Sequence, residues 1–250
     1  MSDTIKTIEN AFDVIDLLEA HEKMGVGEIS SNLGLAKTTT HRILKTLASR
    51  GIVDQDDQER YTLGYGMYKY ARGINHHNLL INLARKPMKE FAKKTGETLN
   101  LGVLVDQEVI VIHFEEGEFY ALQPTLSVNS PLNCSGMGKI FLSEFDDDAL
   151  ASYFSNEFKQ RTINTITSKQ AYLEEKQEIL DKRLAYDNEE YEYGLSCIAT
   201  CILDHDDKVI AALSISGPTS RLRYKQMNNL AKALRAAAQE INQTIKNQVQ

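Results

Sequence analysis

The sequence predicts an α+β protein with an N-terminal winged helix-turn-helix, a linker helix and a larger C-terminal domain. Apolar residues recur every three or four positions through the first 50 residues, which indicates helices. From Thr98 onward, strands, helices and further strands follow one another, which is typical of an α+β layout. The domains are expected at residues 1–66, 67–86 and 87–250, and 250 residues with 42% hydrophobic content are enough for two cores.

The first 50 residues contain three predicted helices in the order of a helix-turn-helix. The first carries the apolar run Ala11, Phe12, Val14, Ile15, Leu17 and Leu18. The second spans residues 26–33, and Gly34 follows it at a tight turn where positive φ comes easily. The third spans residues 36–50 and would enter the DNA major groove. Its buried stripe is expected to consist of Thr40, Ile43, Leu44 and Leu47.

The third helix is distinguished by its charge. Residues 36–50 include lysines and arginines but no carboxylate, although the whole chain has a net charge of −7. An ordinary solvated helix face is the alternative interpretation, and the order of helices favours DNA over it. The predicted DNA contacts are Lys37, Thr38, Thr39, His41, Arg42 and Lys45. Acidic residues outnumber basic ones in residues 1–70, so we expect site-specific binding with modest non-specific affinity.

A hairpin and two helices are predicted to follow. Residues 51–63 form two short strands around the polar turn 54–60, which makes a wing beside the helix-turn-helix. Residues 67–85 have the apolar spacing of a linker helix. Pro87 suits a first helical turn and is expected to open a second helix that Gly96 ends.

The remainder of the chain mixes strands with helices. The expected strands are residues 99–105, 109–114, a segment near 119–122, 196–203 and 209–216. The expected helices lie near residues 138–142, 147–154, 169–184 and 221–245. Thr167 and Gln170 have the spacing of a capping box before the third of these helices.

Composition narrows the class of protein. Three cysteines, an odd number, suit a reducing compartment and argue against a disulfide scaffold. No apolar run reaches the length of a membrane span, and the N-terminus has no hydrophobic segment of a signal peptide. We therefore expect a cytoplasmic protein with no membrane partner.

Several separated motifs resemble one known family. They are TTTHRILKTLASRGIV, RYTLG, TGETLNLGVL, PLNCSGMGKIFL, YDNEEYEYGLSCIA and AALSISGP, in this order along nearly the whole chain. Together they resemble the IclR family of bacterial transcription regulators. The resemblance implies a winged helix-turn-helix, a linker helix and a GAF-like C-terminal domain that binds a small effector. It also implies a homodimer or tetramer, and a repressor rather than an activator.

The resemblance also implies an effector pocket. Its lining positions are Gly136, Met137, Asp187, Leu195, Cys197, Ser214 and Ser216. Residues 135–139 open a helix, and backbone N–H groups at a helix N-terminus attract anions, so an organic acid is the expected ligand. The alternation of side chains along a strand agrees with this set of lining positions, because residues two apart share one face. Met137 stands where alanine is commoner and is expected to reduce or reshape the pocket floor, and Thr40 stands where an aliphatic residue is commoner.

An effector-controlled regulator has two alternatives, an enzyme and a C-terminal domain that only oligomerises. An enzyme is disfavoured because Ile140 follows Lys139, so residues 136–139 are no ATP-binding loop, and because no nucleophile with a base is recognisable. Cys197 and Cys201 have a poor spacing for a metal on a strand. We expect no catalytic residues, no cofactor and no metal. In the other alternative, the C-terminal domain only oligomerises and binds no effector. The sequence thus predicts a DNA-binding regulator, a repressor controlled by a small metabolite.

Overall fold

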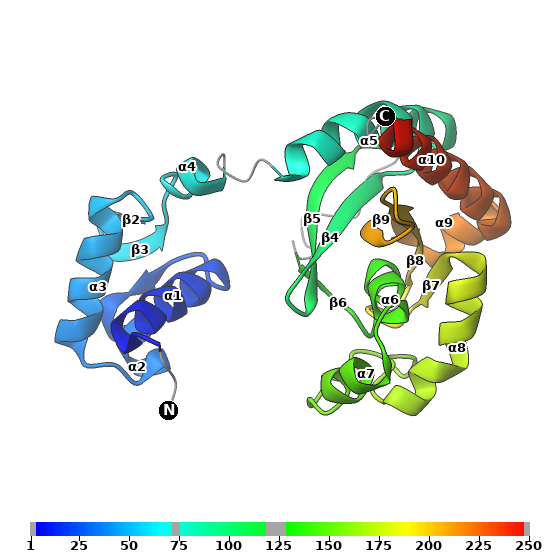
Figure 1. Cartoon of the computed structure of the whole chain (residues 1–250). Helices are drawn as coiled ribbons and strands as arrows, with labels where there is room; N and C mark the ends of the chain where they lie inside the picture. Colours follow the sequence, from blue (N-terminus) through cyan, green and yellow to red (C-terminus); the bar gives the residue numbers. More distant parts are fainter. Residues whose placement is uncertain (1–3, 72–75, 119–128, 248–250) are drawn as a thin grey trace. The chain divides into compact units, whose positions relative to one another are not determined.

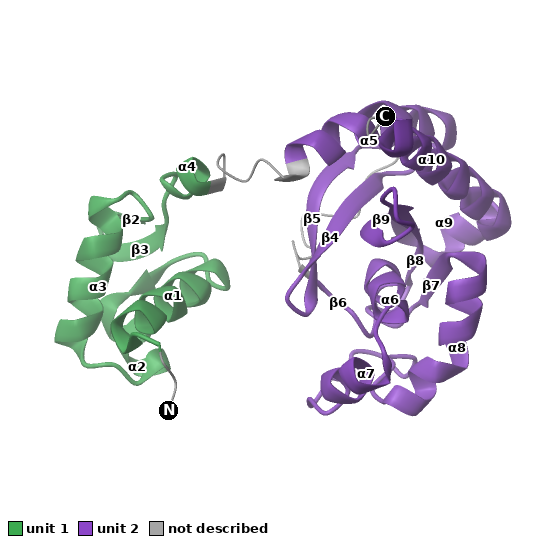
Figure 2. Cartoon of the chain, viewed as in Figure 1, with its two compact units in different colours: residues 1–76 green, residues 77–250 purple. Residues whose placement is uncertain are grey.

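The computed structural model of the chain describes residues 4–71, 76–118 and 129–247 (Figure 1). The chain divides into two compact units, Met1–His76 and His77–Gln250, each with its own hydrophobic core (Figure 2). None of the described helices combines the length and the apolar character that crossing a membrane requires.

Unit 1 is a winged helix-turn-helix, as predicted. It contains α1 (Lys6–Glu19), β1 (Met24–Gly25), α2 (Val26–Leu33), α3 (Lys37–Ser49), β2 (Val53–Gln55), β3 (Arg60–Leu63) and α4 (Met67–Ala71). The strands form one antiparallel sheet in the order β1-β3-β2. Strand β1 was not predicted, because two residues carry no readable periodicity.

The packing of unit 1 follows from its apolar stripes. All four predicted stripe residues of α3 are buried, and Val14 and Leu18 of α1 face the same core. Phe12 belongs to the predicted apolar run of α1 but is 60% exposed. The run wraps too far around the helix for one face to cover it. Gly34 ends α2 with φ 63°, which is the left-handed turn expected there.

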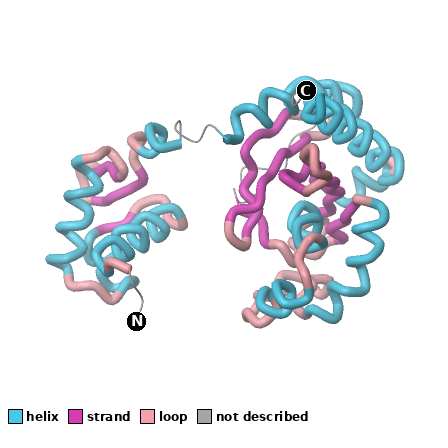
Figure 3. The backbone as a smooth tube through the Cα atoms, in the orientation of Figure 1, coloured by secondary structure: helices cyan, strands magenta, loops and turns pink. Residues whose placement is uncertain are grey.

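Unit 2 is built on one six-stranded antiparallel sheet (Figure 3). Its helices are α5 (His76–Thr95), α6 (Gly136–Ser143), α7 (Asp147–Tyr153), α8 (Lys169–Lys182), α9 (Thr219–Tyr224) and α10 (Met227–Asn247). Its strands are β4 (Leu99–Val105), β5 (Glu108–Glu115), β6 (Asn129–Pro131), β7 (Leu184–Asn188), β8 (Leu195–Leu203) and β9 (Val209–Pro218). The strand order is β6-β5-β4-β9-β8-β7.

Helices cover both faces of the sheet, and each face has a core. Helices α5 and α10 pack on one face, against residues such as Leu101, Ile198 and Leu213. Helix α6 packs on the other face, over Ala199 and Ala212. Neighbouring residues of a strand point to opposite faces. Large side chains on one face and small ones on the other let α6 lie close to the sheet.

The predicted break between a linker helix ending at Arg85 and a second helix opening at Pro87 was wrong. Pro87 does not open a helix but lies inside α5, which is continuous from His76 to Thr95. Proline removes one backbone hydrogen bond and costs about 3 kcal/mol in a helix interior. The buried residues Ala84, Met88 and Phe91 pack on both sides of it and offset that cost.

The other differences concern caps and short strands. Ser168, not Thr167, caps α8, because its hydroxyl accepts the N–H of Ala171 at 3.3 Å. Strands β6 and β7 were not predicted, and the predicted helix 221–245 is divided into α9 and α10 at Gln226, which has φ 61°. The strand predicted near residues 119–122 lies outside the described residues.

Candidate DNA-binding surface and effector cavity

Helix α3 presents its basic side to solvent. Lys37, Thr38, His41, Arg42 and Lys45 are exposed, and Thr39 is half-buried. The buried stripe on the opposite side holds the helix to the core, so these side chains project from a fixed support. Among the residues that the structure describes, no ion pair involves Lys37, Arg42 or Lys45. Their charge is therefore available to an anionic partner.

Acidic residues elsewhere in unit 1 are partly neutralised by their own partners. Asp56 at the wing tip accepts from Lys23 Nζ at 3.0 Å, and Glu28 of α2 accepts from Arg60 at 3.2 Å. The N–H groups of Arg60 and Gln58 also bind Asp56, and these contacts, that of Arg60 above all, hold the pKa of this half-buried carboxyl below its usual range.

One cavity in unit 2 gathers every predicted effector residue. Its volume is about 40 Å³, and its lining includes Gly136, Met137, Asp187, Leu195, Cys197, Ser214 and Ser216. Because one water molecule needs about 10–15 Å³ of such a cavity, this one has room for about three waters. The lining also includes Ser135, from the segment 135–139 in which an anion was expected. The sequence did not indicate the remaining lining residues, which are Ser130, Tyr191 and Ser196.

The sheet forms the floor of the cavity. Asp187 of β7 pairs with Cys197 of β8, and Cys197 pairs with Ser216 of β9, so the three side chains form a row across neighbouring strands. Ser214 lies two residues from Ser216 on the same face. A Cβ atom on Gly136 would lie 2.9 Å from Cys197 Sγ, so glycine is required where α6 meets this floor.

The first turn of α6 forms the facing wall. The hydroxyl of Ser135 accepts the N–H of Gly138 at 3.1 Å and donates to the carbonyl of Pro131 at 2.6 Å. Both hydrogen bonds fix the helix start. They leave the N–H groups of Gly136 and Met137 as the first-turn donors without an intrahelical acceptor.

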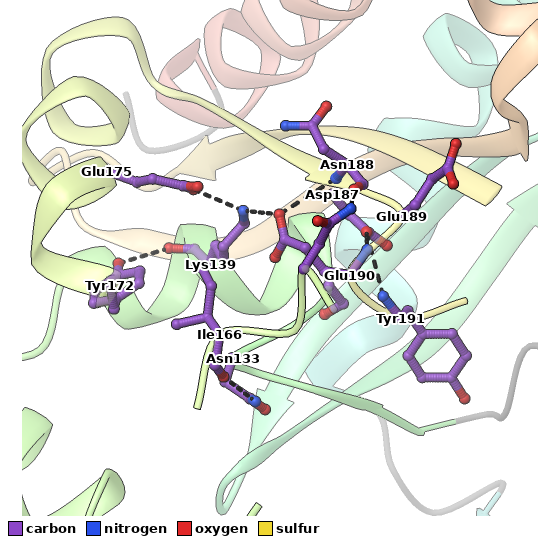
Figure 4. Close-up of polar contacts among 12 residues, drawn as sticks. Asn133, Lys139, Ile166, Tyr172, Glu175, Asp187, Asn188, Glu189, Glu190 and Tyr191 are labelled. Carbon is purple, nitrogen blue, oxygen red and sulfur yellow. Dashed lines mark hydrogen bonds and ion pairs between the residues drawn. The ribbon is translucent and has the colours of Figure 1, made fainter. Parts of the chain in front are cut away.

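Asp187 is the acidic group of the cavity. Its Oδ1 accepts the N–H of Glu190 at 2.7 Å and that of Tyr191 at 3.4 Å (Figure 4). Burial raises the pKa of the Asp187 carboxyl to about 7, although these two N–H groups oppose the shift. The carboxyl therefore changes its charge near neutral pH.

A buried ion pair lies directly behind Asp187. Lys139 of α6 is fully buried, and its Nζ lies 2.6 Å from Glu190 Oε1 and 2.7 Å from Glu175 Oε2 of α8 (Figure 4). Burial alone would lower the pKa of Lys139, but the Glu190 and Glu175 carboxylates raise it overall, so the ammonium stays charged. This pair joins the helix of one cavity wall to the turn that follows Asp187.

The remaining polar groups of the floor are neutral. Burial raises the pKa of the Cys197 thiol to about 12, so this sulfur is no activated nucleophile at neutral pH. Ser214 is 1% exposed, and its Oγ has no oxygen or nitrogen partner among the described residues; it lies beside the Cys197 sulfur, which is a weak acceptor. A carboxylate in the cavity would offer this buried hydroxyl a stronger acceptor than the thiol does.

A loop before α8 supports the turn that follows Asp187. Thr162 donates to the carbonyl of Glu189 at 2.6 Å, and Thr165 donates to that of Glu190 at 2.7 Å. The guanidinium of Arg161 lies 4.2 Å from the centre of the Tyr191 ring. No motif marks this loop in the sequence, since its role depends on a long-range contact.

Comparison with known proteins matches both units. Residues 7–57 match the family described as "IclR helix-turn-helix domain", and residues 72–243 match "Bacterial transcriptional regulator IclR C-terminal". The chain is 29% identical over 243 residues to the transcriptional regulator KdgR of Escherichia coli, covering 96% of this chain and 92% of KdgR. It is 30% identical over 235 residues to the transcriptional repressor AllR of E. coli, covering 91% and 87% of the two chains.

Solved structures share the fold. The crystal structure of an IclR homolog from Microbacterium hydrocarbonoxydans, complexed with 4-hydroxybenzoate, superposes with a TM-score of 0.82. The match covers 96% of this chain and 99% of the homolog at 19% identity.

Proposed function

This chain belongs to the IclR family of bacterial transcriptional regulators, and on that premise we propose that it is a repressor whose operator binding is controlled by a small organic acid. Family membership makes it a DNA-binding regulator. The repressor role, the effector class, the oligomeric state and the residues that act are the proposal. The observation that carries it is the pairing of an unoccupied basic helix face in unit 1 with a polar cavity in unit 2.

Helix α3 is the proposed recognition helix. Lys37, Thr38, Thr39, His41, Arg42 and Lys45 are the proposed contacts to base edges and phosphates. Its buried stripe is anchored in the core, and its basic side chains have no intramolecular ion pairs among the described residues. A rigid, free basic face is what docking in a major groove requires.

A homodimer or tetramer is the proposed assembly. A symmetric dimer reads a pseudo-palindromic operator whose half-sites lie about 34 Å or a multiple of it apart. Residues 67–86 are the proposed linker, through which the state of the C-terminal domain changes the placement of the two winged domains. The name of the related AllR, a repressor, supports this sign of regulation.

The cavity is the proposed effector site. Gly136, Met137, Asp187, Leu195, Cys197, Ser214 and Ser216 are the proposed ligand contacts. Backbone N–H groups at the start of α6 and the serine hydroxyls of the lining suit a carboxylate. A homolog of the same fold was crystallised with 4-hydroxybenzoate, which is such an acid. An effector that switches the protein must prefer one arrangement of the domains, typically by ~1–3 kcal/mol.

Operator binding by an α3 variant tests the proposal. Fluorescence anisotropy with a fragment from the protein's own promoter region would compare Arg42→Ala with Lys6→Ala, which removes one positive charge from α1 instead. If Arg42 reads a base, Arg42→Ala loses roughly 1–3 kcal/mol of binding and discriminates less between operator and scrambled DNA. Lys6→Ala should bind like the wild type. Unchanged operator binding by Arg42→Ala would contradict the proposed docking of α3.

A further inference from the structure

The cavity contains an acidic side chain and no basic one among its described lining residues. Asp187 is 5% exposed and is the only aspartate, glutamate, lysine, arginine or histidine of that lining. Residues 119–128, which the structure does not describe, include no lysine, arginine or histidine in their sequence. A carboxylate ligand beside an ionised Asp187 would meet a like charge in a poorly solvated space, which is unfavourable.

The groups around Asp187 do not supply the missing positive charge. Those that face it or lie next to its neighbours are Glu190 and Tyr191 of its own turn, Lys139 of α6, Cys134, Cys197 of β8, Glu175 of α8 and Arg161. The ammonium of Lys139 is already paired with two carboxylates, at 2.6 Å and 2.7 Å. Both thiols are neutral because burial raises their pKa to about 12. Arg161 is exposed and rests on the Tyr191 ring.

We propose that the cavity takes up a small carboxylate together with one proton, which Asp187 keeps and uses to donate a hydrogen bond to the ligand. This inference rests on the proposed effector site and adds the chemical form in which the ligand is bound. The proton comes from solvent and stays on the Asp187 carboxyl, and the ligand remains an anion that accepts the hydrogen bond. No covalent bond changes.

The geometry assigns a role to each Asp187 oxygen. Oδ1 is engaged by the N–H groups of Glu190 and Tyr191, and no described residue is hydrogen-bonded to Oδ2. A proton on Oδ2 turns this oxygen into a donor. The ligand carboxylate then accepts from Asp187, from the buried hydroxyl of Ser214 and from N–H groups at the start of α6. The residues that carry these donors line the same cavity, where an uncharged acceptor would form weaker hydrogen bonds with them.

The consequence is a steep pH dependence of effector binding. Burial places the pKa of the free Asp187 carboxyl at about 7, so above neutral pH the empty cavity is charged and must be protonated before a carboxylate binds. The affinity for a carboxylate then falls as pH rises through 7, approaching tenfold per pH unit, and about 0.9 proton is taken up per ligand at pH 8. Asp187→Asn mimics the protonated carboxyl at every pH.

Isothermal titration calorimetry on the full chain tests this. Acetate, glycolate, pyruvate and 4-hydroxybenzoate serve as probes, each titrated between pH 6 and 9 in two buffers of different ionisation enthalpy. The wild type should lose roughly 50-fold in affinity for a bound probe between pH 7 and 9 and take up about 0.9 proton at pH 8. Asp187→Asn should bind the same probe with nearly constant affinity and no proton uptake. Ser214→Ala should bind more weakly with the wild-type pH dependence.

Other results would overturn the inference in distinguishable ways. A carboxylate that binds at pH 8 with no proton uptake would contradict the proton coupling but not the proposed effector site. The same holds for an affinity that rises with pH because a ligand hydroxyl donates to ionised Asp187. Failure of every carboxylate to bind both the wild type at pH 6 and Asp187→Asn contradicts the proposed effector class as well. Promoter binding and the thermal unfolding midpoint of each variant report whether it is folded.

Discussion

Removing Lys139 is expected to destabilise unit 2 strongly, although this lysine lies in no predicted site. Its side chain is 0% exposed, and that of its partner Glu190 is 4% exposed. Glu190 Oε2 already lacks a partner among the described residues. In Lys139→Met the apolar stem is kept and the ammonium is lost, so Glu190 becomes a buried, uncompensated charge. Breaking a buried pair in this way costs about 3–5 kcal/mol.

Glu175 offers a matched control for the same lysine. Its carboxylate lies 2.7 Å from Lys139 Nζ, but its side chain is 42% exposed, so solvent screens it. Glu175→Gln should therefore cost less than about 1 kcal/mol. In the double variant Lys139→Met with Glu190→Leu no charge is left buried, and most of the lost stability should return.

Urea unfolding followed by circular dichroism measures these differences. The two units have separate cores, so the effect is expected in one transition while the other keeps its midpoint. The lost stability of Lys139→Met should come with weaker effector binding, since Glu190 also donates its N–H to Asp187 at 2.7 Å. A single variant within 1 kcal/mol of the wild type, or a double variant as unstable as the single one, would refute the reasoning.

Three further predictions concern side chains at the cavity and in α3. Burial raises the pKa of Asp187 in the folded state, so charging of this carboxyl opposes folding. The stability of the wild type relative to Asp187→Asn should therefore fall by on the order of 3 kcal/mol between pH 5 and pH 8, measured by urea unfolding at these two pH values. Met137 lines the cavity and is 5% exposed. Met137→Ala should lose about 2–3 kcal/mol of stability and favour longer carboxylates, whereas Met137→Leu should keep the wild-type preference in a calorimetric series from acetate to hexanoate. Thr40 is buried, and its hydroxyl donates a long hydrogen bond to the Ala36 carbonyl at 3.3 Å. Thr40→Val should therefore change the free energy of unfolding by less than about 1 kcal/mol and leave the operator affinity unchanged. A larger loss of stability or of operator affinity would show that this hydroxyl matters.

Local patterns were sufficient for the helix-turn-helix. The buried stripe of α3 follows from the 3.6-residue period alone, and Gly34 marks its turn because few other residues adopt positive φ. The same kind of reasoning failed at Pro87, where packing on both sides outweighs a local helix-breaking preference. The period does not decide which apolar side chains of α1 are covered: Phe12 belongs to the predicted run and is 60% exposed.

The cavity was predictable only in part. The family resemblance supplied the seven candidate positions, and strand alternation showed that Ser214 and Ser216 share a face. The pairing of β7 with β8, which brings Asp187 beside Cys197, depends on register between strands and has no local signal. The burial of Lys139 was also unreadable, because a lysine in a helix is usually solvated.

The central claim is that a ligand in the unit 2 cavity and DNA on α3 influence each other. The most direct measurement is operator affinity by fluorescence anisotropy with and without a saturating carboxylate that calorimetry shows to bind, together with the affinity for that carboxylate with and without operator. We predict weaker operator binding with the ligand, by roughly 5- to 150-fold, and the same factor in the reverse direction. Binding of each partner that is unaffected by the other would contradict the claim.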